Sequence, residues 1–208
     1  MFDIFLRALK DRLLEPLARL LGPRVPPNVV TLLACLVGLA CGAAAWRQRY
    51  AAALALWAAN RLLDGLDGTL ARVHARQTDF GGYLDILLDF VVYTAVPTGL
   101  ALGRPTPATL AACIALIGSF FINAASWMYL AAVLESRAAG AAARGERTTG
   151  TMPPGLIAGT ETVILYTLFL AVPDHLRGLF ALMAALVYLT VLQRIWWAWR
   201  NLTRRTIH

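Results

Sequence analysis

Six long apolar runs limit what this sequence can fold into. They occupy, to within a few residues, positions 29–46, 50–73, 82–102, 107–134, 155–172 and 176–199. An α-helix needs about 20 residues to cross roughly 30 Å of hydrocarbon, and these runs approach or exceed that length. The chain is 59% hydrophobic and only 15% charged, unlike a soluble domain of this size. We therefore predict an all-α, polytopic membrane protein with six transmembrane helices.

The first 22 residues follow a different pattern. Apolar residues from Phe2 to Leu17 recur at near-helical spacing, with basic residues between them. This pattern predicts an amphipathic helix that lies in the inner membrane interface, with a cytosolic helix packed on the bundle as the alternative. The predicted organisation is an interfacial helix at 1–22, a six-helix transmembrane domain at 28–200 and a tail at 201–208.

The distribution of basic residues predicts the orientation of the helices. If both termini lie in the cytoplasm, all but four of the 19 Lys and Arg residues fall on the inner side. The four on the outer side are Arg47, Arg49, Arg104 and Arg177. This asymmetry follows the positive-inside rule, so we expect both termini, including the tail, to be cytoplasmic. The net charge of +7 sits at helix ends and loops, which favours anionic lipid surfaces over nucleic acid as the partner.

Four aspartates interrupt the second and third runs: Asp64, Asp67, Asp85 and Asp89. Spacings of three and four residues place each pair on one helix face, and the short link between the runs makes the helices antiparallel neighbours. Both pairs should then lie near the cytoplasmic end. Carboxylates in one membrane cleft repel unless cations lie between them. Aspartate oxygens suit Mg²⁺ or Mn²⁺, so the sequence predicts a divalent-metal site.

Small residues and an arginine accompany these acids. Gly68, Ala71 and Gly81 leave room for a ligand near the backbone, although tight helix packing is the alternative explanation for such glycines. Arg72 adds a side chain that can donate two parallel hydrogen bonds to a phosphate. Metal-binding carboxylates, a phosphate-binding arginine and small residues together describe a diphosphate site.

The spacing of these residues resembles the signature of the CDP-alcohol phosphotransferase family. The sequence reads Asp64-x-x-Asp67-Gly68-x-x-Ala71-Arg72, then eight residues, then Gly81-x-x-x-Asp85-x-x-x-Asp89, and every signature position matches. The Pro-Asn-x-x-Thr element at positions 27–31 is also similar, so the resemblance covers nearly the whole chain. The sequence around the signature, including residues 60–63 and 159–162, resembles most a bacterial inner-membrane branch of the family.

The resemblance implies a reaction of phospholipid biosynthesis. Members of the family transfer the phosphoryl-linked part of a CDP-alcohol, usually CDP-diacylglycerol, to a second alcohol and release CMP. By carry-over from the signature, Asp64, Asp67 and Asp85 would hold two Mg²⁺ or Mn²⁺ ions. Asp89 would complete the metal site and act as general base. The CDP pocket would be shaped by Asp64, Asp67, Gly68, Ala71, Arg72 and Gly81. The resemblance also implies a homodimer in the bacterial inner membrane, with the active site facing the cytoplasm.

Several polar residues outside the signature carry weaker predictions. Thr160 and Glu161 lie within the fifth run, where an acid suggests an acceptor pocket; an ion pair with Arg61 or Arg137 is the alternative. Asp79 is expected to cap the third helix. The fourth run carries three polar residues on one face, which interhelical hydrogen bonding explains without a ligand: Ser119, Asn123 and Ser126.

Three other functions stay open from the sequence. One is transfer from a CDP-choline or CDP-ethanolamine type of donor to diacylglycerol. Another is a divalent-cation transporter, since buried acids also mark ion pathways, but residues 50–57 and 91–102 contain no charge and close one end of such a path. The third is a structural lipid-binding protein, which would not need Arg72 and Asp89 in addition to metal ligands.

Overall fold

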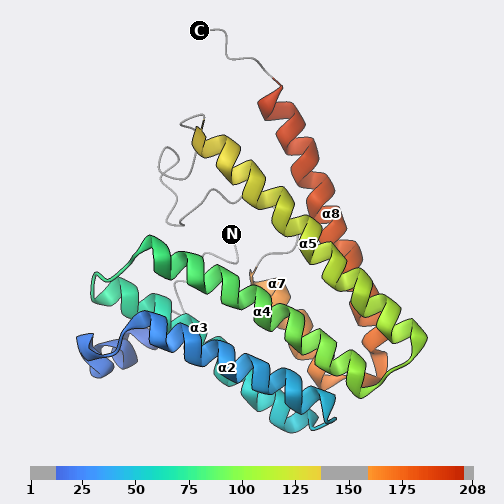
Figure 1. The fold of residues 1–208 in the computed structure, drawn as a ribbon, viewed down its shortest axis with the longest axis horizontal. Coiled ribbons are helices and arrows are strands. Elements are labelled where there is room, and N and C mark those ends of the chain that lie inside the picture. Colours follow the sequence, from blue (N-terminus) through green and yellow to red (C-terminus); the bar gives the residue numbers. More distant parts are fainter. Residues whose placement is uncertain (1–12, 137–158, 204–208) are drawn as a thin grey trace. The chain divides into compact units, whose positions relative to one another are not determined.

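A computed structural model describes residues 13–136 and 159–203 (Figure 1), and within them every long element is a helix. The long helices are α2 (Pro27–Trp46), α3 (Tyr50–Val73), α4 (Asp79–Gly103), α5 (Pro107–Ser136), α7 (Gly159–Ala171) and α8 (Leu176–Leu202). Two short 3₁₀ segments, η1 (Gly22–Arg24) and η2 (Pro173–His175), precede α2 and α8. No strand occurs in the described ranges, which confirms the predicted all-α class.

Four stretches are long and apolar enough to cross a membrane. They are Pro27–Trp46, Asp79–Gly103, Pro107–Ser136 and Pro173–Leu202. Helix α3 has the length but carries four charged residues from Arg61 onward, and α7 spans 13 described residues. The run predicted at 155–172 therefore begins outside the described residues. The structure supports four candidate spans by length and composition, and six helices at the predicted places.

The chain divides into two compact units, and the predicted site lies in the first. Unit 1 comprises residues 1–110 and 159–176 and contains α2, α3, α4 and α7. Glycines let α2 and α4 approach closely, because a Cβ atom on Gly42 would lie 2.8 Å from the carbonyl oxygen of Ala95. A Cβ atom on Gly99 would in turn overlap the carbonyl group of Gly42. The backbones of these two helices therefore pack directly on each other at this level.

Polar contacts join the helix connections at one end of unit 1. The turn between α2 and α3 contains Gln48 in a left-handed conformation (φ 57°), and its side-chain amide donates to the carbonyl oxygen of Gly103 at 2.6 Å. Arg104, directly after α4, pairs with Asp174 of η2. Three helix connections that are distant in sequence are thereby tied together.

Residues 13–21 are helical and pack against the opposite end of unit 1. Ala18 is buried in a small cluster with Val30, Leu66 and Leu70, and its carbonyl oxygen lies 3.1 Å from Nε2 of His74. The leucines of the other face are exposed: Leu13, Leu17, Leu20 and Leu21. The described half of the N-terminal segment is thus helical and two-faced, and the first 12 residues of the prediction lie outside the described residues.

Unit 2 comprises residues 111–158 and 177–208, and α5 and α8 run side by side in it (Figure 1). Arg194 of α8 is buried and its Nη1 donates to the side-chain oxygen of Asn123 at 2.9 Å, with Ser126 at 3.4 Å. The predicted interhelical hydrogen bonding is confirmed for these two residues. It is wrong for Ser119, whose hydroxyl donates to the carbonyl oxygen of Leu116 in its own helix at 2.7 Å. A serine within a helix can satisfy its hydroxyl locally, which the face pattern cannot reveal.

Candidate active site

Two helix segments supply the signature acids. Asp64 and Asp67 lie in the second half of α3, and Asp85 and Asp89 lie in the first half of α4. Asp79 is not the cap of α4, as the sequence suggested. The cap is Thr78, whose hydroxyl accepts a hydrogen bond from the backbone N–H of Gly81 at 3.0 Å. Both residue types cap helices well, so their order in the chain leaves the choice open.

Gly81 marks a close approach between the start of α4 and the start of α2. A Cβ atom at this position would lie 3.1 Å from the Thr78 hydroxyl and 3.2 Å from the side-chain oxygen of Asn28. Asn28 belongs to the Pro-Asn-x-x-Thr element that opens α2. The glycine and this element therefore meet in space, and any larger side chain would have to displace one of the two polar groups.

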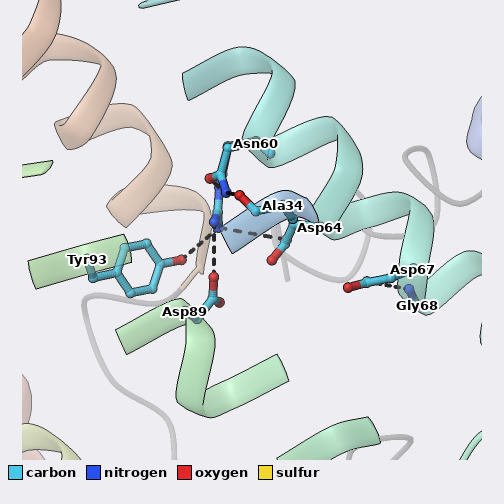
Figure 2. Close-up of polar contacts among 8 residues, drawn as sticks. Ala34, Asn60, Asp64, Asp67, Gly68, Asp89 and Tyr93 are labelled. Atoms are coloured by element: carbon cyan, nitrogen blue, oxygen red, sulfur yellow. Dashed lines mark hydrogen bonds and ion pairs between the residues drawn. The ribbon is translucent and has the colours of Figure 1, made fainter. Parts of the chain in front are cut away.

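Arg61 joins the acids of α3 to those of α4. Its Nη2 donates to Oδ1 of Asp89 at 3.0 Å, and its Nη1 lies 3.7 Å from Oδ2 of Asp64. Figure 2 shows Asp64 and Asp89 reaching from their two helices toward this contact, while Asp67 lies apart beside Gly68. One guanidinium is thus shared between two signature carboxylates, which leaves a net negative charge.

The guanidinium of Arg61 is held on every side. Its Nε donates to the side-chain oxygen of Asn60 at 2.8 Å, and its Nη1 donates to the Tyr93 hydroxyl at 3.0 Å. The charge also lies over the rings of Trp57 and Tyr93, with centroid distances of 4.8 and 5.3 Å. Cation–π contacts of this kind strengthen when the cation is shielded from water. The side chain is only 13% exposed, so its position is fixed by packing as well as by hydrogen bonds.

The residues around Arg61 are themselves anchored to other helices. Asn60 donates to the carbonyl oxygen of Ala34 in α2 at 2.7 Å. Tyr166 of α7 stacks on Trp57 and donates its hydroxyl to the carbonyl oxygen of Tyr93 at 2.6 Å. All four long helices of unit 1 therefore contribute to holding one arginine.

Asp67 is the most deeply buried of the four acids. Its Oδ1 accepts a hydrogen bond from the backbone N–H of Gly68 at 2.5 Å, and its Oδ2 is buried without a partner among the described residues. The hydroxyl of Thr31, beside this carboxyl group, donates instead to the carbonyl oxygen of Pro27. A buried carboxylate oxygen without a donor is available as a ligand, so this residue fits the divalent metal that the sequence predicts.

The four carboxylates act on one another electrostatically. The charges of Asp64 and Asp85 both act on Asp89, and those of Asp64 and Asp89 act on Asp67. In the described parts of the chain, however, no three His, Cys, Asp or Glu side chains are gathered closely enough to hold one ion. Asp64 and Asp89 turn toward Arg61, and Asp67 turns toward the backbone of α3. The structure brings the predicted acids into one region without closing them around a single point.

The predicted phosphate-binding residues cluster one turn further along α3. The guanidinium of Arg72 folds back over Gly68, because a Cβ atom on that glycine would lie 3.1 Å from Nη1 of the arginine. Nη2 of Arg72 reaches the Thr69 hydroxyl at 3.4 Å, and the residue is exposed. Ala71 is half-buried on the same turn. The guanidinium of Arg72 therefore lies in the space that a side chain at position 68 would occupy.

Thr160 and Glu161 occupy the first turn of α7, in the same unit as the aspartates. The alternative in which Glu161 pairs with Arg61 is wrong, since the ion pairs of Arg61 are with Asp64 and Asp89. The other suggested partner, Arg137, lies outside the described residues. The structure therefore leaves the acceptor-pocket prediction for these two residues as a prediction.

Sequence reasoning missed the residues that surround Asp89. The sequence patterns suggest Glu161 as the partner of Arg61 and assign no role to Trp57, Tyr93 or Tyr166. A signal was present, because Arg61 precedes Asp64 by three residues and Tyr93 follows Asp89 by four. Both spacings place the pairs on one helix face.

Membrane-length helices that carry an acidic cluster beside an exposed arginine define a class of helical membrane proteins with a charged internal site. Comparison with known proteins shows which family of membrane proteins this is. The chain belongs to the CDP-alcohol phosphatidyltransferase family, whose model matches residues 24–203. It is thus a membrane phosphotransferase, as the signature indicated.

Curated relatives and solved structures match this chain over nearly its whole length. The chain is 34% identical over 200 residues to the inner membrane protein YnjF of Escherichia coli K12, covering 94% of both chains. It is 30% identical over 195 residues to the archaetidylinositol phosphate synthase of Methanothermobacter thermautotrophicus, covering 92% of this chain and 91% of the relative. The phosphatidylinositol phosphate synthase PgsA1 of Mycobacterium tuberculosis, solved with CDP-DAG bound, aligns with a TM-score of 0.72 at 23% identity over 95% of this chain and all of that one. A second crystal structure of PgsA1, with manganese and citrate, aligns with a TM-score of 0.70 at 23% identity over 93% of both chains.

Proposed function

We propose that this protein transfers a phosphatidyl group from CDP-diacylglycerol to an alcohol and releases CMP. The observation that carries the proposal is the convergence of the signature acids from α3 and α4, with a buried Asp67 oxygen that lacks a donor among the described residues. The choice of donor draws support from the solved relative with CDP-DAG bound. Phospholipid synthesis is the process in which such a transfer takes place.

In this proposal Asp64, Asp67 and Asp85 hold two divalent cations, either Mg²⁺ or Mn²⁺. Once bound, the cations neutralise the diphosphate and stabilise the negative charge that develops on the leaving CMP. Arg72 donates hydrogen bonds to a phosphate, and Gly68, Ala71 and Gly81 leave room for the nucleotide. Manganese in a solved relative supports the metal class but does not choose between the two ions.

Asp89 completes the metal site and acts as the general base. The acceptor oxygen attacks the phosphorus of the phosphatidyl group, the bond from that phosphorus to the CMP oxygen breaks, and the acceptor proton passes to Asp89. A positioned carboxylate contributes typically about 10²–10⁴-fold to such a step. Thr160 and Glu161, at the start of α7, are proposed to line the acceptor pocket.

We further propose that the six helices cross the bacterial inner membrane with both termini and the site on the cytoplasmic side. Residues 1–22 would lie in the interface, 28–200 would form the catalytic domain, and 201–208 would be a cytoplasmic tail. The exposed leucines of residues 13–21 support the interfacial part, and the similarity to an inner membrane protein supports the location. Assembly as a homodimer is part of the same proposal.

The decisive experiment measures CMP release from CDP-diacylglycerol by the purified chain with Mg²⁺ or Mn²⁺. The alcohols supplied are inositol, inositol phosphate, glycerol phosphate and serine, and the lipid product is identified by mass. We expect acceptor-dependent release that Asp89→Asn lowers by at least about 100-fold. The matched control is Asp174→Asn, an exposed aspartate at the other end of unit 1, which should retain activity.

Each contrary result points to a different function. Release of CMP only from CDP-choline or CDP-ethanolamine with diacylglycerol would identify the other donor class. Metal movement across vesicles without any CMP release would identify a transporter. Release that continues undiminished in Asp89→Asn would remove that residue from the base role.

A further inference from the structure

Arg61 lies within the proposed metal site but is not one of the signature positions. It stands one turn before Asp64 on α3 and contacts Asp89 across the gap to α4. A positive charge beside carboxylates that are meant to attract metal weakens that attraction. Its presence therefore calls for a function of its own.

The geometry of the Arg61 contact differs between the two acids. The contact with Asp89 is a hydrogen bond of 3.0 Å from Nη2 to Oδ1, whereas Oδ2 of Asp64 lies 3.7 Å from Nη1. The guanidinium is therefore bonded to Asp89 and only near Asp64. One oxygen of Asp89 is engaged, and the other, Oδ2, lies outside this contact.

Moving the Arg61 side chain away from the acids would also cost considerable free energy. Its Nε and Nη1 are bonded to Asn60 and Tyr93, and the cation lies over two aromatic rings. Displacement by a metal would break these contacts together and leave a mostly buried charge without them. The network is built to hold the guanidinium in place, not to release it.

Resting on the proposed function, we propose that Arg61 is a positioning residue that keeps Asp89 oriented for the acceptor alcohol. As a fixed cation it holds Oδ1 of Asp89 and limits how strongly that carboxylate is drawn to metal. Asp64, Asp67 and Asp85 are then the main metal ligands. The arginine thereby leaves most of the metal binding to these three acids and keeps Asp89, which completes the site, free to accept the proton.

The proposal makes a prediction that a scaffold role does not make. In Arg61→Gln one positive charge is lost and Asp89 is released, so the site should bind Mn²⁺ about tenfold more tightly. Turnover should fall at the same time, by about tenfold or more, because the base is no longer oriented. If Arg61 only held the helices together, its loss would weaken Mn²⁺ binding and turnover alike.

The test titrates Mn²⁺ into the purified full-length chain and follows free Mn²⁺ by electron paramagnetic resonance, with CMP release measured separately. Arg104→Gln is the matched control, since it makes the same charge change in unit 1 at a residue paired with Asp174, away from the acids. Its Mn²⁺ affinity should stay within about twofold of the wild type. Equal or weaker Mn²⁺ binding by Arg61→Gln than by this control overturns the proposal.

Arg61→Lys keeps the test decisive if the glutamine variant does not fold. Lysine retains the charge but cannot contact Asn60, Tyr93 and Asp89 in one plane. Mn²⁺ affinity should therefore remain within about twofold of wild type while kcat falls about tenfold. Wild-type kcat in this variant, or a large loss of Mn²⁺ affinity, overturns the proposal.

The Mn²⁺ titration needs no substrate, so it tests the role of Arg61 separately from the proposed catalytic activity. Tighter Mn²⁺ binding by Arg61→Gln in a protein that releases no CMP would contradict the proposed function and support the role of Arg61 in restraining the acids. Normal CMP release by the wild type, together with weaker Mn²⁺ binding by Arg61→Gln, would support the proposed function and contradict the role of Arg61 in restraining the acids.

Discussion

Each unit contains an arginine that is largely shielded from solvent, and the two units stabilise it in opposite ways. Arg61 in unit 1 has two carboxylates within 4 Å and two aromatic rings around it. Arg194 in unit 2 is 6% exposed, contacts Asn123 and Ser126, and has no carboxylate within salt-bridge distance in the parts of the chain that the structure describes. Its Nε is buried without a hydrogen-bond partner there.

The difference shows what each arginine stabilises. Removing Arg61 would leave two negative charges facing each other, so its partners depend on it. Removing Arg194 would leave only neutral amide and hydroxyl groups, which can form other hydrogen bonds. A buried ion pair costs most when one partner is lost, whereas a buried charge with neutral partners is costly while it is present. The comparison can be tested by substitution.

The largest expected contrast is between Arg61→Met and Arg194→Met. The first should lower the free energy of unfolding by about 3 kcal/mol, because it leaves Asp64 and Asp89 without their shared cation. The second should change it by less than about 1 kcal/mol, since methionine fills similar space without a charge to desolvate. Unfolding in mixed micelles measures both. Equal losses in the two variants would remove the distinction between the arginines.

A second contrast compares glycines of the two units. Gly99→Ala should destabilise the protein by about 1–3 kcal/mol, because the new methyl group would overlap the backbone of Gly42. Gly178→Ala in α8 meets no atom within 4 Å and should be neutral or stabilising by up to about 1 kcal/mol. Thermal unfolding in detergent checks the pair. A stable Gly99→Ala variant would show that α2 and α4 pack less tightly than described.

The smallest contrast involves single hydroxyl groups. Tyr166→Phe removes a 2.6 Å hydrogen bond to the carbonyl oxygen of Tyr93 in the aromatic cluster around Arg61, and should cost about 1 kcal/mol. Ser126→Ala removes a 3.4 Å contact to Arg194 and should cost less than about 0.5 kcal/mol. The same unfolding assay compares them. A larger effect at Ser126 would mean that Arg194 depends on it more than the distance suggests.

Sequence patterns predicted the helices well because apolar length and charge position are local properties. The predicted boundaries of α2, α3 and α5 lie within two residues of those observed. The signature acids were located for the same reason, since spacings of three and four residues fix a helix face. The family followed from eight matching positions, and the match to the family model confirmed it.

Contacts between helices could not be predicted in the same way. The bond from Arg61 to Asp89 and the stacking of Tyr166 on Trp57 depend on how four helices meet, which no spacing within one helix contains. The cap of α4 was wrong by one residue, because Thr78 and Asp79 have similar capping ability and only the backbone at Gly81 decides between them. Spacings within one helix could be interpreted from the sequence, but contacts between residues of different helices could not.

The ties made by Gln48 and Arg104 have a mechanical consequence for unit 1. They fasten the α2–α3 turn to the last carbonyl group of α4, and the residue after α4 to the segment before α8. Helices that are fixed to one another at one end can still move apart at the other end. We therefore expect the hinge for reactant entry to be at these ties, with the widest opening beside Gly81 and Arg72.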